Sequence, residues 1–99
     1  MTKTESIQNL LKKVCNRLRV AQSNIFDKSK KRKNIDARHM FFYICKQHNI
    51  NIHYIQEYAN DKYDQYIDHS TIIYAQNKMA EKVDGDADWR NLYNEITNK

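Results

Sequence analysis

The chain has 99 residues with no proline and one glycine, and its formal net charge is +5. This length suits one domain with a modest core, and the near absence of glycine and proline favours helices over a turn-rich sheet. No apolar run approaches the ~20 residues of a membrane span, and charges along the N-terminal segment exclude a signal peptide. We therefore expect a single helical domain over residues 1–99, in the cytoplasm and without a membrane partner.

Residues 5–22 predict a first helix, because apolar residues recur there at the spacing of one helical face. These residues are Ile7, Leu10, Leu11, Val14, Cys15 and Leu18. After a short turn, we expect Ile25 and Phe26 to anchor the chain to the core. The two cysteines, Cys15 and Cys45, both fall in expected helices. We interpret them as reduced core thiols of a cytoplasmic protein, in preference to a disulfide or metal ligands.

The basic segment, residues 28–33, reads K-S-K-K-R-K and has five cations in six positions. It belongs to a basic half, since residues 1–50 hold 12 Lys or Arg against 3 Asp or Glu, whereas residues 51–99 hold 5 against 9. This asymmetry indicates a polyanion-binding face, although a solvated surface or a flexible linker fits the same charges. Because the segment stands between two amphipathic helices, we favour a loop lying on a phosphate backbone or reaching into a minor groove.

A second helix is expected from Asp36, as its N-cap, through about His48. Its inward residues are Met40, Phe41, Ile44 and Cys45. Arg38 and Lys46 lie off this apolar stripe and are expected to be free to meet phosphates.

Asn51 is the expected N-cap of a short third helix, over residues 51–59. The apolar face of that helix is formed by Ile52, Ile55, Tyr58 and Ala59. Residues 60–67 then make a polar, aromatic connection to the next helix, which is the central element of the predicted fold.

Residues 67–79, I-D-H-S-T-I-I-Y-A-Q-N-K-M, predict a helix that presents a polar N-terminus outward. Asp68 carries the side-chain oxygen that an N-cap needs. The first turn is polar: His69, Ser70 and Thr71. The apolar stripe that follows is narrow: Ile72, Ala75 and Met79. Lys78 and Lys82 come late, where the helix dipole favours cations, and this build is typical of a helix that enters the DNA major groove end first.

The turn Asp84-Gly85-Asp86 is expected to end that helix. A last helix then has an inner face of Trp89, Leu92, Tyr93 and Ile96. The whole pattern predicts an all-α fold of about five helices, with a helix-turn-helix built from residues 51–59 and 68–82.

These segments resemble the C-terminal duplex-DNA-binding domain, domain IV, of the bacterial replication initiator DnaA. The family's D-H-T-T-V-x-H-A run is similar to D-H-S-T-I-I-Y-A at residues 68–75, and its basic loop and Arg-Gln-Met helix start are similar to residues 28–40. The similarity extends over about residues 5–97. It implies an all-α helix-turn-helix fold of the DnaA domain IV and Trp-repressor kind, and a monomer that reads a short A/T-rich box in double-stranded DNA.

The resemblance also implies roles for individual residues. The run from Asp68 to Thr71 would meet base edges in the major groove, while one of Lys30, Lys31 or Arg32 would enter the adjacent minor groove. Arg38 and Lys46 would hold phosphates. The full set expected at DNA is Lys28, Lys30, Lys31, Arg32, Lys33, Arg38, His39, Lys46, Ile52, His53, Asp68, His69, Ser70, Thr71, Tyr74 and Lys78.

The chain departs from the family at several points that bear on the preferred sequence and not on the fold. The connection before Asp68 is longer and lacks the family's paired glycines, Ile67 stands in place of an Arg, and His53 replaces a Pro. One glycine cannot make a G-x-x-x-x-G-K phosphate loop, so ATP-driven opening of origins is not expected. We expect a role in replication initiation or its regulation, with replication proteins as further partners.

Other kinds of site find less support. His39, His48, His53 and Cys45 lack zinc-finger spacing, and the acidic run around Gly85 lacks the Glu that would close a calcium loop. The seven tyrosines are scattered, which favours packing over single-strand stacking, although Tyr66 and Tyr74 remain candidates for DNA contact. Consecutive residues 68–70 cannot face one another as a catalytic relay, so we expect a non-enzyme without cofactors. The alternatives are a transcriptional repressor, or a protein-interaction module that has lost specific DNA reading.

Overall fold

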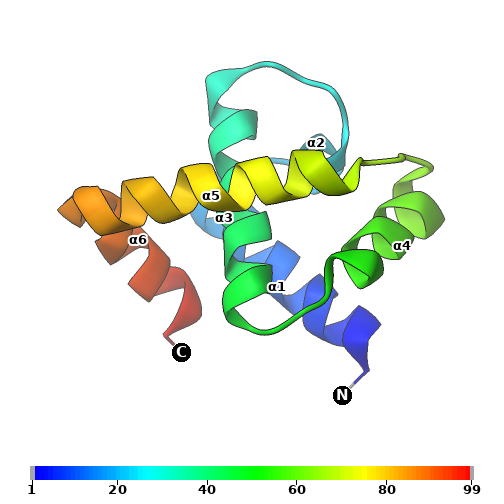
Figure 1. Ribbon diagram of the computed structural model, residues 1–99, viewed down its shortest axis with the longest axis horizontal. Helices are drawn as coiled ribbons and strands as arrows, with labels where there is room; N and C mark the ends of the chain where they lie inside the picture. Colours follow the sequence, from blue (N-terminus) through cyan, green and yellow to red (C-terminus); the bar gives the residue numbers. More distant parts are fainter. Residues whose placement is uncertain (1, 99) are drawn as a thin grey trace.

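The computed structural model describes residues 2–98, and this part of the chain is helical, with short connecting segments (Figure 1). Its helices are α1 (Lys3–Leu18), α2 (Ser23–Phe26), α3 (Arg32–Gln47), α4 (Ile52–Tyr63), α5 (His69–Gly85) and α6 (Ala87–Thr97). The predicted all-α class is confirmed. One helix more than expected is present because the chain around Ile25 and Phe26 closes a single helical turn, in which both side chains are buried.

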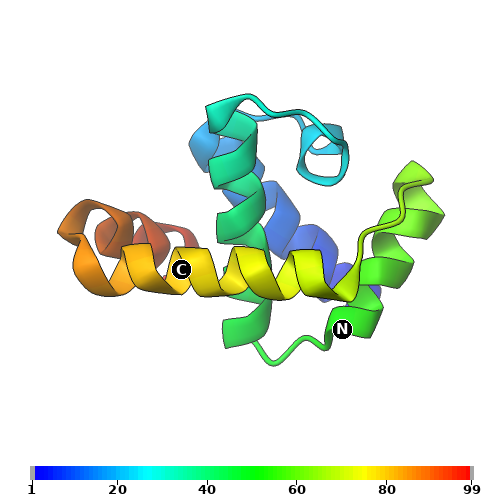
Figure 2. The same ribbon diagram turned by 45° about the horizontal axis from the view of Figure 1, so that its top comes forward.

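The core is organised around α3, which α5 crosses on one side and α1 on the other (Figures 1 and 2). Phe41, Phe42 and Ile44 of α3 are fully buried, and every helix contributes at least one side chain to the same apolar cluster. The predicted inward faces of α1, α4 and α5 are confirmed by the burial of Leu11, Ile55 and Ile72. The two cysteines are free and buried, as expected.

Helix α1 begins with a capping box, in which Thr2 and Glu5 exchange hydrogen bonds through side chain and backbone. It ends at Leu18, and the predicted end at residue 22 is wrong. Arg19 adopts a left-handed conformation with φ of 58°, and the Val20 N–H bonds back to the Cys15 carbonyl at 3.1 Å. These contacts close the helix four residues earlier than the apolar spacing suggested.

Helix α3 begins at Arg32, and the predicted N-cap at Asp36 is wrong. Lys31 occupies the N-cap position without a side-chain capping bond. Asp36 instead lies inside the helix, where it accepts a hydrogen bond from Lys82 of α5 at 3.3 Å. Arg32 and Lys33 therefore belong to a helical turn, and the non-helical part of the basic segment is shorter than expected.

The predicted cap of the third helix is confirmed, since the Asn51 side chain accepts from the His53 N–H at 2.9 Å. Helix α4 continues to Tyr63, so the expected connection over residues 60–67 is helical in its first half. Asp64 ends the helix with φ of 53°. Gln56 donates to the Ile67 carbonyl at 2.9 Å, and Ile67 is buried, so the turn between α4 and α5 is held against the core.

Helices α5 and α6 meet at Asp86, which caps α6 by accepting from the Asp88 N–H at 2.8 Å. Helix α6 packs near the end of α5 that is remote from the α4 turn (Figure 1). Its predicted inner face is confirmed: Ile96 is buried, and Trp89, Leu92 and Tyr93 are half-buried. None of the helices within residues 2–98 is long and apolar enough to cross a membrane.

Candidate nucleic-acid interface

The reading tip, residues 68–71, stands at the exposed N-terminus of α5. Asp68, His69, Ser70 and Thr71 are all exposed, whereas Ile72 directly after them is fully buried. Burial therefore fixes the direction of the helix while its first turn faces outward. Asp68 has the extended backbone of an N-cap, but its side chain makes no capping hydrogen bond, so the predicted capping role of the carboxylate is wrong. That carboxylate is left available to an outside donor.

The exposed face continues along α5 beyond the reading tip. Tyr74 is 58% exposed and Ile73 is 39% exposed. The Lys78 ammonium lies 5.7 Å from the Tyr74 ring centroid, and the His39 ring meets the same tyrosine edge-on. This arrangement places His39, Tyr74 and Lys78, three of the predicted contact residues, on one continuous surface with the tip.

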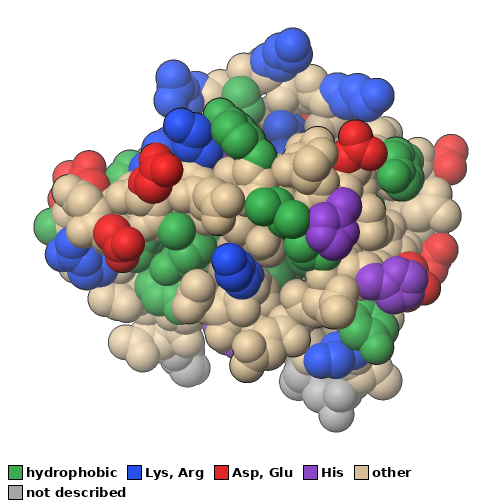
Figure 3. Space-filling view, viewed as in Figure 1, with side chains coloured by type: hydrophobic (Ala, Val, Ile, Leu, Met, Phe, Trp, Pro, Cys, Tyr) green, Lys and Arg blue, Asp and Glu red, His purple; other side chains and the backbone are tan. Residues whose placement is uncertain are grey.

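The five cations of the basic segment are all exposed: Lys28, Lys30, Lys31, Arg32 and Lys33. Lys and Arg side chains gather at the end of the molecule formed by the α2–α3 connection and the start of α3 (Figure 3). The connection is not a free linker, because its backbone and side chains are bonded internally. Ser29 donates its N–H to Asp27 at 2.9 Å, and the buried Asn34 donates to the Ser29 hydroxyl at 2.8 Å.

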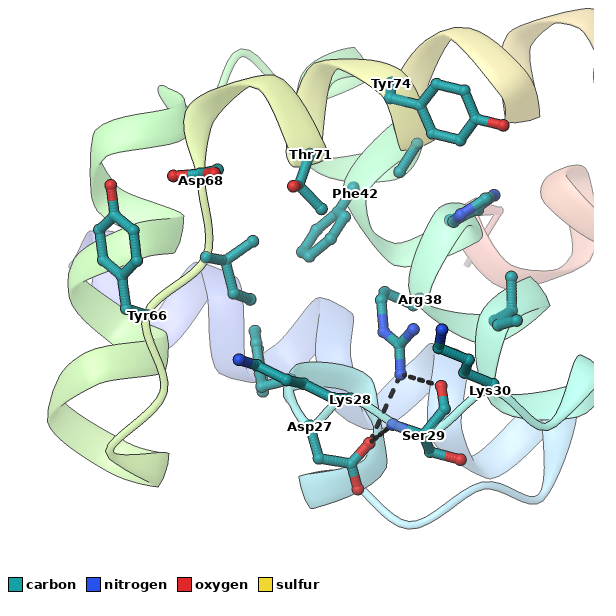
Figure 4. A pocket seen from close by; sticks show the side chains of 15 residues that line it. Asp27, Lys28, Ser29, Lys30, Arg38, Phe42, Tyr66, Asp68, Thr71 and Tyr74 are labelled. Carbon is teal, nitrogen blue, oxygen red and sulfur yellow. Dashed lines mark hydrogen bonds and ion pairs between the residues drawn. The ribbon is translucent and has the colours of Figure 1, made fainter.

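Arg38 is the main correction among the predicted phosphate ligands. Its side chain is only 15% exposed, so it is not free as expected. The guanidinium donates to the carbonyls of Ile25, Asn24 and Ser29 at 2.7, 2.9 and 3.2 Å. It also lies 3.5 Å from the Asp27 carboxylate (Figure 4). Burial lowers the pKa of Arg38, and the charge of Asp27 opposes that shift.

The position of Arg38 explains why the basic segment is ordered. Its guanidinium, which belongs to α3, donates to the Ile25 carbonyl in α2 and to the Ser29 carbonyl in the basic segment. These bonds hold both of those stretches against α3. Arg38 lies four residues from both Asn34 and Phe42, which are buried, and so shares their helix face. Because Asn34 is polar, the apolar spacing of the sequence did not mark this face as an inward one. Arg38 is therefore a positioning residue for the basic segment.

A cleft of about 830 Å³ separates the basic segment from the reading tip. Lys28 and Lys30 line one side, and Asp68, Thr71 and Tyr74 line the other (Figure 4). The rest of its lining is largely apolar and includes Phe26, Ile35, Phe42, Ile67 and Ala75.

His39 also lines the cleft and is half-buried. Burial lowers the pKa of His39, and the positive charges of Lys82 and Arg38 act in the same direction. The carboxylate of Asp36 acts against this shift. The imidazole is thereby favoured in its neutral form, with the ring packed against Tyr74.

Three predicted residues neither line the cleft nor belong to the basic segment or to α5. Lys46 is exposed in the last turn of α3, on the other side of α5 from the basic segment (Figure 1). Ile52 is half-buried and His53 is exposed at the start of α4, where the imidazole lies 3.1 Å from Glu57. Tyr66, which the sequence left as a candidate for DNA contact, is 73% exposed and lines the cleft beside the tip.

A helix pair with an exposed polar turn at the start of its second helix, beside an ordered cluster of cations, defines a helix-turn-helix DNA-binding domain. The family model described as bacterial dnaA protein helix-turn-helix matches residues 7–79, and the chain belongs to that family. Domains of this family bind double-stranded DNA and are not catalytic. A comparison with curated proteins found no match.

Proposed function

We infer that the chain reads a specific A/T-rich site of DnaA-box type in double-stranded DNA. The observation that carries this proposal is the reading tip, which is exposed at all four positions while the helix behind it is anchored in the core. A rigid helix with a free polar end can meet base edges in a major groove at a defined angle.

The chemistry of the tip supports base reading. The Asp68 carboxylate, which makes no capping bond, can accept from a cytosine amino group. The Thr71 methyl group can contact a thymine methyl, and the His69 imidazole and Ser70 hydroxyl offer donors and acceptors. The cations on the far side of the cleft would lie at the neighbouring minor groove, where A/T-rich sequence concentrates negative potential.

In this proposal the protein acts as a monomer in the bacterial cytoplasm, bound to the nucleoid. It takes part in replication initiation or its regulation by occupying initiator boxes, and replication proteins are its further partners. Occupation of a box inside a promoter would make the same domain a transcriptional repressor.

A second candidate, a protein-interaction module, is favoured by the exposed apolar side chains of Ile73 and Tyr74. The two functions differ in their response to salt, because DNA binding releases counterions and partner binding through apolar surface does not. If about six phosphates are met, affinity for DNA should fall by roughly 10³-fold between 50 and 200 mM salt.

Fluorescence anisotropy with a box duplex and a scrambled duplex of equal composition tests the proposal. We expect a clear preference for the box, which the combined His69→Ala and Thr71→Ala variant loses at ~1–3 kcal/mol per base contact. Replacing Lys30, Lys31 and Arg32 with Ala should weaken binding to both duplexes and reduce the salt slope.

The control for charge, with two cations removed, is the combined Lys12→Ala and Lys13→Ala variant, because these exposed lysines of α1 lie outside the proposed interface. This variant should keep both the affinity and the box preference. Equal, weak binding of the two duplexes by the unmodified chain would reject the specific reader.

A further inference from the structure

The turn between α4 and α5, residues 64–68, leads directly into the reading tip and contains no glycine (Figure 1). Backbone hydrogen bonds to the last turn of α4 hold its first two residues, Asp64 and Gln65. Of the side-chain hydrogen bonds in the described part of the chain, one reaches the rest of this turn. Gln56 of α4 donates it to the Ile67 carbonyl, at 2.9 Å.

This bond acts on the peptide unit that joins Ile67 to Asp68. The Ile67 carbonyl group and the nitrogen and Cα atoms of Asp68 lie in one plane, because the peptide bond resists rotation. Fixing the carbonyl oxygen on α4 therefore fixes the orientation in which the chain enters Asp68. Asp68 has φ of −61° and ψ of 144°, and its carbonyl accepts from the Ile72 N–H at 3.2 Å as α5 begins.

Apolar packing alone does not set this orientation. The Ile67 side chain is buried and Ile72 anchors α5 in the core, but apolar contacts have no preferred direction. The Asp68 side chain makes no capping hydrogen bond to its own helix, so it adds no restraint of its own. A hydrogen bond is directional, and the one from Gln56 supplies a restraint that the packing lacks.

We propose that Gln56 is a positioning residue for base reading, because its bond to the Ile67 carbonyl aims Asp68 at the base edges. The assignment rests on the proposed function and adds a residue of α4 that determines specificity without touching DNA. Gln56 is half-buried, so water can replace its bond to the carbonyl when the side chain is changed. Its loss should therefore affect the fold little and base recognition more.

Gln56→Met tests the assignment, since it keeps the length of the side chain and removes the donor. Affinities for the box and scrambled duplexes are measured by anisotropy. We expect the ratio of the two affinities to fall about tenfold, as for one lost base contact, while scrambled-duplex affinity stays within about twofold of the unmodified chain. Combined with Asp68→Ala, the variant should lose much less than the product of the two single losses, because both act through one carboxylate.

The matched control is Gln76→Met, which removes the other glutamine bond made to a carbonyl beside α5, that to Phe42 at 3.0 Å. Gln76 lies well behind the reading tip, so this variant should lower stability in urea and keep the affinity ratio. Three results with Gln56→Met would each overturn the assignment. These are an unchanged ratio, an equal weakening of both duplexes, and a full product of losses in combination with Asp68→Ala.

Amide chemical shifts of the free chain separate this assignment from the proposed function. The Asp68 N–H belongs to the peptide unit that Gln56→Met releases, so its signal should move, whereas the Ala75 amide, farther along α5, should not. An unmoved Asp68 amide would reject the positioning role of Gln56. Equal binding of the two duplexes by the unmodified chain would reject the specific reader, and a moved Asp68 amide would still show that Gln56 orients the tip.

Discussion

Arg38 offers the sharpest test of how this interface is built. In the family resemblance it is a phosphate ligand, whereas in the structure it holds the chain between α2 and α3 through three backbone carbonyls. We consider two replacements: Arg38→Met, which keeps most of the length without charge, and Arg38→Lys, which keeps the charge without the planar fork.

The expected cost follows from the contacts. Two of the carbonyl bonds are short, at 2.7 and 2.9 Å, and come from a side chain that is 15% exposed. Hydrogen bonds to charged groups contribute about 1.5–3 kcal/mol each, and partial hydration of the freed carbonyls recovers some of that energy. We expect Arg38→Met to lower the free energy of unfolding by about 2–4 kcal/mol, which a domain of ordinary stability survives.

DNA affinity should fall with the order of the basic segment. Holding one residue's backbone in a single conformation costs about 1–2 kcal/mol, so even partial release of residues 27–31 should weaken duplex binding about tenfold or more. Arg38→Lys should resemble Arg38→Met in both measurements, because one ammonium cannot donate to three carbonyls in the same geometry.

Urea unfolding followed by circular dichroism, together with anisotropy on the box duplex, measures both effects. Lys46→Met is the control, since Lys46 is exposed and its loss should change affinity without changing the free energy of unfolding. Our reasoning would be refuted by two results together: Arg38→Met weakens DNA binding without changing the free energy of unfolding, and Arg38→Lys binds DNA as tightly as the unmodified chain. That combination is the behaviour of a simple phosphate ligand.

Three further predictions concern stability and reactivity. Gln76→Leu removes the buried hydrogen bond to the Phe42 carbonyl, at 3.0 Å, and should lower the free energy of unfolding in urea by about 1 kcal/mol. An unchanged free energy of unfolding would show that this hydrogen bond does not stabilise the fold. Because the pKa of His39 is lowered below its usual 6.5, the unfolded chain takes up the proton first, so stability should fall as pH drops below about 6.5. His39→Gln should flatten that fall, with His53→Gln as control. Burial raises the pKa of Cys15 to about 11 and also raises that of Cys45, so iodoacetamide at pH ~8 should label neither until urea unfolds the chain.

Local sequence was sufficient for most of the helices and for the reading tip. The apolar spacing in α1, α4 and α5 depends on residues three or four apart, and burial of Leu11, Ile55 and Ile72 bears it out. Helix ends were predicted less well. The left-handed residues Arg19 and Asp64 ended helices where no glycine or proline marked a stop.

The amino-acid sequence by itself determined that this protein is a helical domain with a polar turn at the head of one helix and a cluster of cations. Those properties depend on neighbours along the chain. Tertiary structure alone decided that Arg38 faces inward, that the basic segment is ordered, and that a cleft opens between Lys28 and Thr71. Each of these depends on groups brought together from distant positions, such as Arg38 and the Ile25 carbonyl, which no periodicity along the chain can register.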